Sequence, residues 1–268
     1  MSTGNLFPQI SRCVAILALL ATGAIAYAQD AAQKGLAIAT EQKQRDAGWG
    51  DSQAEVSMIL RNAQGQESER KIRIKSLEVQ GDGDKALTIF DQPRDVSGTS
   101  FLSFSHATEP DDQWIYLPEL KRVKRIASRN KSGPFMGSEF AFEDMTSFEL
   151  EKYTYTYLRD EPFQGQECFV VEQRPLDEYS GYTRRVAWID KNHYRALKIE
   201  YYDRKDQLLK VLELNDYKLY QDKFWRPMVA EMTNVQNGKS TVLLTHSIEF
   251  NTGLEEKDFD KNSLRRAR

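Results

Sequence analysis

The chain has 268 residues, of which 40% are hydrophobic, so it is long enough to bury a substantial core. Its 37 Lys and Arg residues nearly balance its 40 Asp and Glu residues, and the resulting net charge of −3 argues against a dedicated nucleic-acid-binding protein.

The first 28 residues have the pattern of a secretory signal peptide. Arg12 is followed by an apolar run, Val14–Ile25, which ends at the small-residue site Ala26-Tyr27-Ala28. We expect cleavage after Ala28, because the run is too short to be a comfortable membrane anchor, which is the alternative interpretation. The mature chain would be one domain, residues 29–268, exported across the membrane. It would keep only Cys168, so an intramolecular disulfide is excluded.

One helix is predicted near the start, over Asp30–Asp46, and Gly48-Trp49-Gly50 ends it. From Asp51 onward the hydrophobic pattern has a period of two, which is typical of β-strands. The predicted strands are Glu55–Arg61, a segment around Ile72 and Ile74, Lys85–Phe90, Thr99–His106, Gln113–Leu117, a segment around Tyr153, Tyr155 and Tyr157, Glu167–Gln173, Thr183–Asp190, Arg195–Asp203, Leu208–Tyr220, Val229–Val235 and Ser240–Phe250.

These short strands are joined by polar turns without intervening helices, so we predict a mainly β fold of the α+β class. It should be a single curved antiparallel sheet, an incomplete barrel of about 11 strands, with a few helices covering its concave apolar face. So little helical material cannot cover the whole sheet, and an apolar cavity between sheet and helices is expected.

Two segments interrupt the strand pattern. Ile126–Phe148 carries too many large apolar side chains for a solvated loop, and we expect it to fold back over an apolar surface, partly as a short helix after Ser138. Whether it acts as a movable lid or as a static plug stays open. The second segment, Thr252–Leu264, should dock on the sheet through Leu254, Phe259 and Leu264.

Residues that could carry catalysis are scattered. The three histidines are far apart, and the chain has no nucleophile elbow, zinc-protease motif, phosphate-binding loop or dinucleotide fingerprint. Cys168 lies in a strand-like run, where a buried inert thiol is expected. We therefore predict that the protein is not an enzyme and uses no cofactor or metal.

The apolar and aromatic strand residues favour binding of a hydrophobic ligand. Candidates for lining the cavity are Val56, Met58, Leu60, Ile72, Ile74, Trp114, Tyr116, Phe135, Met136, Phe140, Phe142 and Met145. The basic residues Lys121, Arg122, Lys124 and Arg125 form either a solvated face or a surface for docking a partner or anionic head groups.

Several segments together resemble the outer membrane lipoprotein-sorting protein family, which is related to the periplasmic lipoprotein carrier of Gram-negative bacteria. They are Gly98–Leu102, Asp112–Pro118, Val123–Ile126, Phe135–Phe140 with Glu143-Asp144, and Tyr202-Asp203. The most specific are Trp-x-Tyr-Leu-Pro and Phe-x-Gly-Ser-acidic-Phe, where Glu139 stands in place of the family's common Asp.

The resemblance implies an incomplete barrel that holds acyl chains or another hydrophobe in the periplasm. It also implies an inner-membrane transporter of the resistance-nodulation-division (RND) type as partner. We therefore predict a periplasmic carrier or chaperone for a lipid or lipoprotein, without a nucleic-acid partner and with transient contact at the membrane surface. The alternatives are an accessory scaffold of an envelope transport complex and an enzyme acting on a lipid or glycan.

Overall fold

The computed structural model describes residues 28–266, so the predicted signal peptide lies almost entirely outside the described residues. The predicted N-terminal helix is confirmed and occupies residues 28–45. The strands are β1 (Asp51–Arg61), β2 (Glu67–Leu77), β3 (Lys85–Gln92), β4 (Ser100–Phe104), β5 (Asp112–Leu117), β6 (Arg122–Arg125), β7 (Tyr153–Phe163), β8 (Gln166–Pro175), β9 (Arg184–Asp190), β10 (Ala196–Tyr202), β11 (Leu208–Tyr220), β12 (Phe224–Asn234) and β13 (Ser240–Phe250).

Short helical elements complete the described chain. Six are 3₁₀ turns, and a last α-helix of one turn lies near the C-terminus. They are η1 (Pro118–Leu120), η2 (Ser128–Asn130), η3 (Phe135–Gly137), η4 (Phe142–Met145), η5 (Leu150–Lys152), η6 (Glu256–Asp258) and α2 (Ser263–Arg266). Across residues 28–266, no helix combines the length and apolar character that a membrane crossing requires.

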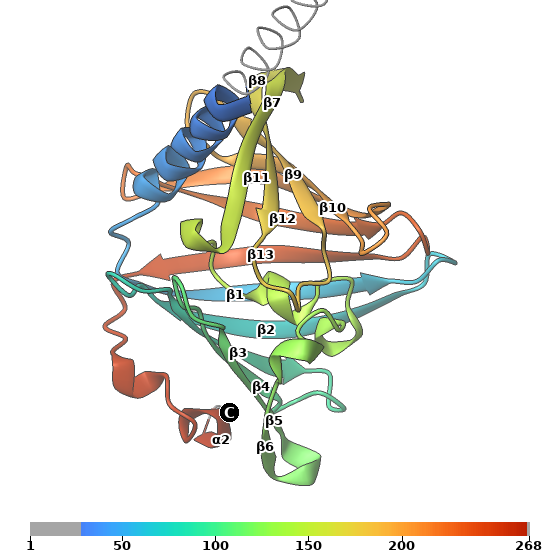
Figure 1. Ribbon diagram of the computed structural model, residues 1–268. Helices are drawn as coiled ribbons and strands as arrows, with labels where there is room; N and C mark the ends of the chain where they lie inside the picture. The colour runs from blue at the N-terminus through green and yellow to red at the C-terminus, as the bar shows by residue number, and fades with distance from the viewer. Residues whose placement is uncertain (1–27, 267–268) are drawn as a thin grey trace, which may run out of the picture.

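All 13 strands form one curved, open antiparallel sheet in the order β6-β5-β4-β3-β2-β1-β13-β12-β11-β10-β9-β8-β7 (Figure 1). The expected count of about 11 strands was therefore too low. The strand that the sequence pattern did not reveal is β6, whose four residues Arg122–Arg125 show no apolar alternation. Three of them are exposed, which suits an edge strand, because charged side chains there discourage pairing with another chain.

The chain enters the sheet in the middle and covers one half before the other. It runs outward from β1 to the edge strand β6, crosses to the opposite edge strand β7, and returns inward until β13 pairs with β1. Residues 126–152, here named the crossing segment, make this one long connection (Figure 1). Every other step joins neighbouring strands, which explains why the sequence shows strands and short turns almost throughout.

The crossing segment packs on the concave face. Phe135 and Phe140 are buried in a core cluster with Met58 of β1, Ile72 of β2 and Phe101 of β4. The rings of Phe135 and Phe101 meet edge to face, with centroids 5.0 Å apart, a favoured aromatic geometry. The predicted folding of this segment over an apolar surface is therefore confirmed, although it forms 3₁₀ turns instead of an α-helix.

The C-terminal segment packs on the opposite face of the same sheet. Phe259 and Leu264 are buried against Leu102 of β4 and Trp114 of β5. Because side chains alternate along a strand, the neighbouring residues Phe101 and Ile115 face the crossing segment instead. The predicted docking of this segment is confirmed, with Leu254 packed at the margin of the same cluster.

The N-terminal helix covers the other half of the concave face (Figure 1). Ile38 and Ala39 are buried against Tyr155 of β7 and Val171 of β8. The helix can come this close because Gly35 has no side chain: a Cβ at this position would lie 2.7 Å from the backbone nitrogen of Tyr157.

Candidate functional site: a cavity under the N-terminal helix

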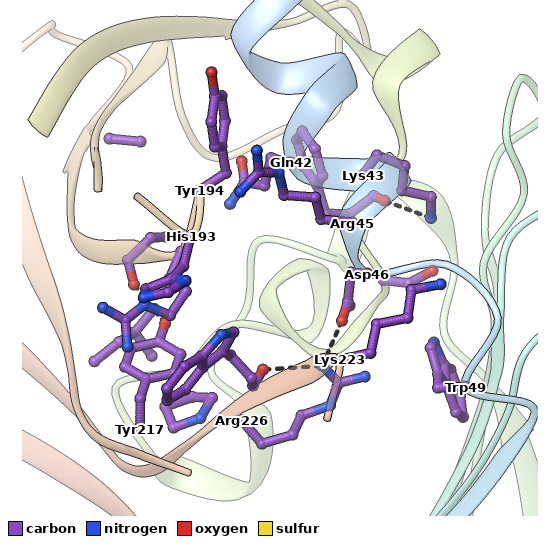
Figure 2. A pocket seen from close by; sticks show the side chains of 18 of the residues that line it. Gln42, Lys43, Arg45, Asp46, Trp49, His193, Tyr194, Tyr217, Lys223 and Arg226 are labelled. Atoms are coloured by element: carbon purple, nitrogen blue, oxygen red, sulfur yellow. Dashed lines mark hydrogen bonds and ion pairs between the residues drawn. The ribbon is translucent and has the colours of Figure 1, made fainter. Parts of the chain in front are cut away.

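A cavity of about 800 Å³ lies between the last turns of the N-terminal helix, the loop that follows it and the concave face of β8 to β12 (Figure 2). Its volume is within the range of about 300–1,000 Å³ found for ligand pockets. It is lined by Gln42, Lys43, Arg45, Asp46, Trp49, Asp84, Ser147, Phe148, Gln173, Arg185, Ala187, His193, Tyr194, Arg195, Ala196, Ile199, Leu214, Tyr217, Leu219, Asp222, Lys223, Trp225, Arg226 and Pro227.

Apolar side chains on the strands form much of the wall. Ala187, Ile199 and Leu214 come from three adjacent strands, β9, β10 and β11, and Phe148 of the crossing segment and Trp225 of β12 add aromatic surface. Methylene groups of a ligand would leave water on entering such a space, which is favourable in proportion to the apolar area removed from water.

Polar contacts hold the helix that forms the opposite wall. Lys43 Nζ lies 3.0 Å from Glu149 Oε2 and donates a hydrogen bond of 2.9 Å to the Phe148 carbonyl oxygen. At the end of the helix, Arg226 of β12 pairs with Asp46, and Figure 2 shows this pair at the cavity. These contacts hold the helix in place as the wall of the cavity that lies opposite the strands.

Charged side chains of both signs line the cavity. Six lysine and arginine side chains line it against three aspartates, Asp46, Asp84 and Asp222. Burial raises the pKa of Asp84 to about 6 and also raises that of Asp46, against the opposing charge of Arg226. Both shifts reflect the cost of removing a carboxylate from water. Four of the six cations are paired with carboxylates.

The structure brings ten of the sequence-predicted lining residues together, but in the core cluster under the crossing segment. Val56, Met58, Leu60, Ile72, Ile74, Phe135, Met136, Phe140, Phe142 and Met145 all belong to this cluster. The other two, Trp114 and Tyr116, lie on the opposite face with Phe259 and Leu264. None of the twelve lines the cavity under the helix.

The residues that line this cavity are not among the lining candidates that the sequence predicted. A signal was present in β9, where Arg185 alternates with Ala187 and Ile189 on one strand face. A cation in an otherwise apolar alternating row is unusual, because arginine is seldom buried without a partner. The basic residues Lys121, Arg122, Lys124 and Arg125 are exposed at the β6 edge, away from the cavity lining.

Buried polar contacts fasten the crossing segment to the sheet. Lys210 of β11 lies 2.7 Å from Asp144 Oδ2 and also donates a hydrogen bond of 2.9 Å to the Glu139 carbonyl oxygen. The Tyr182 hydroxyl lies 3.0 Å from both Asp144 oxygens. Movement of this segment would separate buried charged groups, which is costly.

Reactive groups in the described chain are engaged in structural contacts. Cys168 is fully buried, and burial raises the pKa of its thiol. The Ser57 hydroxyl lies 2.6 Å from Glu69 Oε1 and 2.8 Å from His246 Nε2. A hydroxyl that donates its only proton to Glu69 cannot also donate to the imidazole. Residues 28–266 contain no group of three or more His, Cys, Asp or Glu residues placed to hold a metal ion.

The sequence and the fold are similar to those of known proteins. A family model described as an uncharacterized protein matches residues 82–266. Among curated proteins, none matches the chain. A domain described as an outer membrane lipoprotein-sorting protein from Vibrio parahaemolyticus is 64% identical, with a TM-score of 0.87 over 88% of this chain and 100% of that chain.

Two further structures extend the similarity. A DUF1329 family protein from Desulfovibrio piger is 27% identical, with a TM-score of 0.83 over 87% of this chain and 99% of that chain. A LolA superfamily protein from Nitrosomonas europaea shares the fold at 18% identity, with a TM-score of 0.69 over 87% of this chain and 99% of that chain. On the strength of the Vibrio match, which spans that entire domain, the chain belongs to the outer membrane lipoprotein-sorting protein family.

Proposed function

We propose that the protein is a non-catalytic periplasmic carrier that holds a lipid or the lipid part of a modified protein in the cavity under the N-terminal helix. The observation that carries this proposal is the cavity itself, about 800 Å³ in volume with apolar strand residues along its wall. Burial of an acyl chain contributes about 0.8 kcal/mol per methylene group, so affinity requires no covalent chemistry. Family membership supports the same conclusion.

The cargo site of this proposal lies under the helix, and the crossing segment closes the neighbouring part of the concave face. Contact of cargo with the core cluster around Met58 and Phe135 would require the crossing segment to move away. The predicted contact of the ten core residues with cargo would therefore occur only if the crossing segment opened.

Binding of a neutral dye tests the cavity directly. N-phenyl-1-naphthylamine should become fluorescent on binding the wild-type protein, and Ala196→Trp, which places an indole at the cavity wall, should weaken this binding about tenfold or more. Ala63→Trp makes the same change at an exposed turn and should bind like the wild type. Native mass spectrometry of protein isolated from its own envelope should reveal the retained cargo.

The proposal fails if the wild type binds neither dye nor lipid, or if Ala196→Trp, shown by circular dichroism to be folded, binds both as well as Ala63→Trp does.

We also propose that delivery involves an inner-membrane transporter of the RND type, and that the exposed basic edge at β6 meets the partner or anionic head groups. Lys121, Arg122 and Lys124 are exposed there, and basic side chains attract anionic surfaces. Flotation with vesicles containing phosphatidylglycerol tests this edge: replacement of these three residues by Gln should reduce binding, and equal binding would contradict the proposal.

A further inference from the structure

Among the described residues, Arg185 is the one arginine of the cavity that has no acidic partner. Arg45, Arg195 and Arg226 also line the cavity, and each forms an ion pair with Glu41, Asp190 or Asp46, respectively. Within residues 28–266, Arg185 has no carboxylate within the 4.0 Å of an ion pair.

The hydrogen bonds of Arg185 are also incomplete. Its Nη2 donates one bond of 2.6 Å to Gln173 Oε1, and this is the one side-chain hydrogen bond that the guanidinium makes to residues 28–266. Its Nε is the single buried side-chain nitrogen or oxygen in the described chain that lacks a partner. A guanidinium has five N–H donors, so four of them lack a side-chain partner within residues 28–266.

The surroundings of Arg185 are aromatic and cannot neutralise it. Its guanidinium carbon lies 4.1 Å from the ring centroid of Tyr153 and 6.0 Å from that of Phe148. Asp144 acts on its charge from a longer distance, but Asp144 is already bound by Lys210 and Tyr182. A guanidinium that is removed from water without a nearby carboxylate lowers the stability of the protein, unless a bound anion pairs with it.

We propose that Arg185 is the anchor for an anionic group of the cargo, a carboxylate or a phosphate attached to an acyl chain. This inference rests on the proposed function and names the cargo class: an anionic amphiphile whose head group binds the guanidinium while its chain lies along Ile199 and Leu214. The planar fork of arginine matches two oxygens of a carboxylate or phosphate.

Ligands that have the same alkyl chain but different head groups test whether Arg185 binds the head group. The competing ligands are dodecanoate, dodecyl phosphate and dodecanol, each kept below its solubility or micelle limit, and the measurement is the displacement of N-phenyl-1-naphthylamine from the protein. We expect the wild type to prefer at least one of the two anions over dodecanol by about tenfold or more, because charge-assisted hydrogen bonds are the strong ones. The anion that binds more tightly shows whether the head group of the cargo is a carboxylate, as in a fatty acid, or a phosphate.

Three variants assign the preference to Arg185. Arg185→Gln should bind dodecanol like the wild type and lose the preference for the anions. Arg185→Lys should keep part of the preference, because lysine keeps the positive charge but lacks the planar guanidinium that binds two oxygens at once. Arg184→Gln is the matched control: the same change at the adjacent residue, whose side chain pairs with Asp206 and stacks on Tyr202. It should keep the full preference.

The outcomes separate the two proposals. If dodecanol and both anions bind the wild type equally, the carrier function stands and the anchor is refuted. The anchor is equally refuted if Arg185→Gln, folded by circular dichroism, retains the preference. If none of the ligands displaces the dye and the dye itself does not bind, the proposed function fails as well.

Discussion

Lys210 and Asp144 form an ion pair in which both side chains are almost completely buried, with exposed fractions of 4% and 6%. Lys210 lies on β11 and Asp144 on the crossing segment, so the pair joins the sheet to the one connection that spans it. This contact is one of the buried contacts that hold the segment over the core.

Removal of one member of this pair should be strongly destabilising. Lys210→Met leaves the Asp144 carboxylate buried without its cation, and we expect the free energy of unfolding to fall by about 3–5 kcal/mol. Urea unfolding followed by circular dichroism measures the change. Lys257→Met is the control, since Lys257 and Glu255 form an exposed ion pair and such pairs contribute little to stability. Equal midpoints for the two variants would show that the buried pair does not hold the segment.

Gly35→Ala should destabilise the protein, although alanine is the better helix former. The added Cβ would lie 2.7 Å from the Tyr157 nitrogen and 2.9 Å from Thr156 backbone atoms, so the helix would have to move away from β7. We expect a loss of about 1–3 kcal/mol, as for other overpacked sites, against a gain of about 0.5–1 kcal/mol from helix propensity.

Thermal and urea unfolding measure whether Gly35→Ala lowers the stability of the protein. The control is Gln33→Ala, at an exposed position of the same helix, which should change the stability very little. A more stable Gly35→Ala protein would mean that the helix does not rest on β7 as described. Because the same helix forms one wall of the cavity, Gly35→Ala should also weaken dye binding.

Asp84 should make the protein less stable as the pH rises from about 4 to about 6. Burial raises the pKa of Asp84 to about 6 from an ordinary value of 3.8, with the charge of Lys43 opposing the shift. In this interval the folded state therefore holds a proton that the unfolded state has released, and stability decreases as pH increases. Asp84→Asn removes this titration and keeps an oxygen to accept the hydrogen bond from the Val79 nitrogen.

The comparison of Asp84→Asn with the wild type isolates the effect from the other carboxylates. The stability advantage of the variant should be small at pH 4, grow up to about pH 6 and stay constant above it. Urea unfolding at several pH values measures this difference. An advantage that does not change with pH would show that Asp84 titrates normally.

The strand pattern could be predicted because it depends on residues close together in the chain. Alternation around Val56, Met58 and Leu60 or around Tyr153 and Tyr155 reports a half-buried strand whatever its partner is. Short polar turns between such strands indicate pairing of neighbours, and all but one connection follow this rule. β6 escaped prediction because it is a strand through its pairing with β5, while its mostly exposed side chains give no apolar alternation.

The alternation of residues did not predict which face of each strand points to the concave side of the sheet. Pairing shifts register near Val56, Ile72, Tyr157 and Tyr201, and each irregularity can exchange the two faces. Trp114 and Ile115 are neighbours with similar apolar character, yet one meets the C-terminal segment and the other meets the crossing segment. Trp114 was therefore predicted to share a lining with residues that lie on the opposite face of the sheet.

By itself, then, the sequence determined the class of fold, the N-terminal helix and the docking of the C-terminal segment, since these follow from local periodicity and hydrophobicity. Only the tertiary structure decided where the cavity lies and that Arg185 lines it without an acidic partner. The physical reason is that a cavity is the space left between elements. Its position depends on how closely the helix approaches β7 at Gly35 and where the crossing segment fills the concave face, and these are distances between residues far apart in the chain.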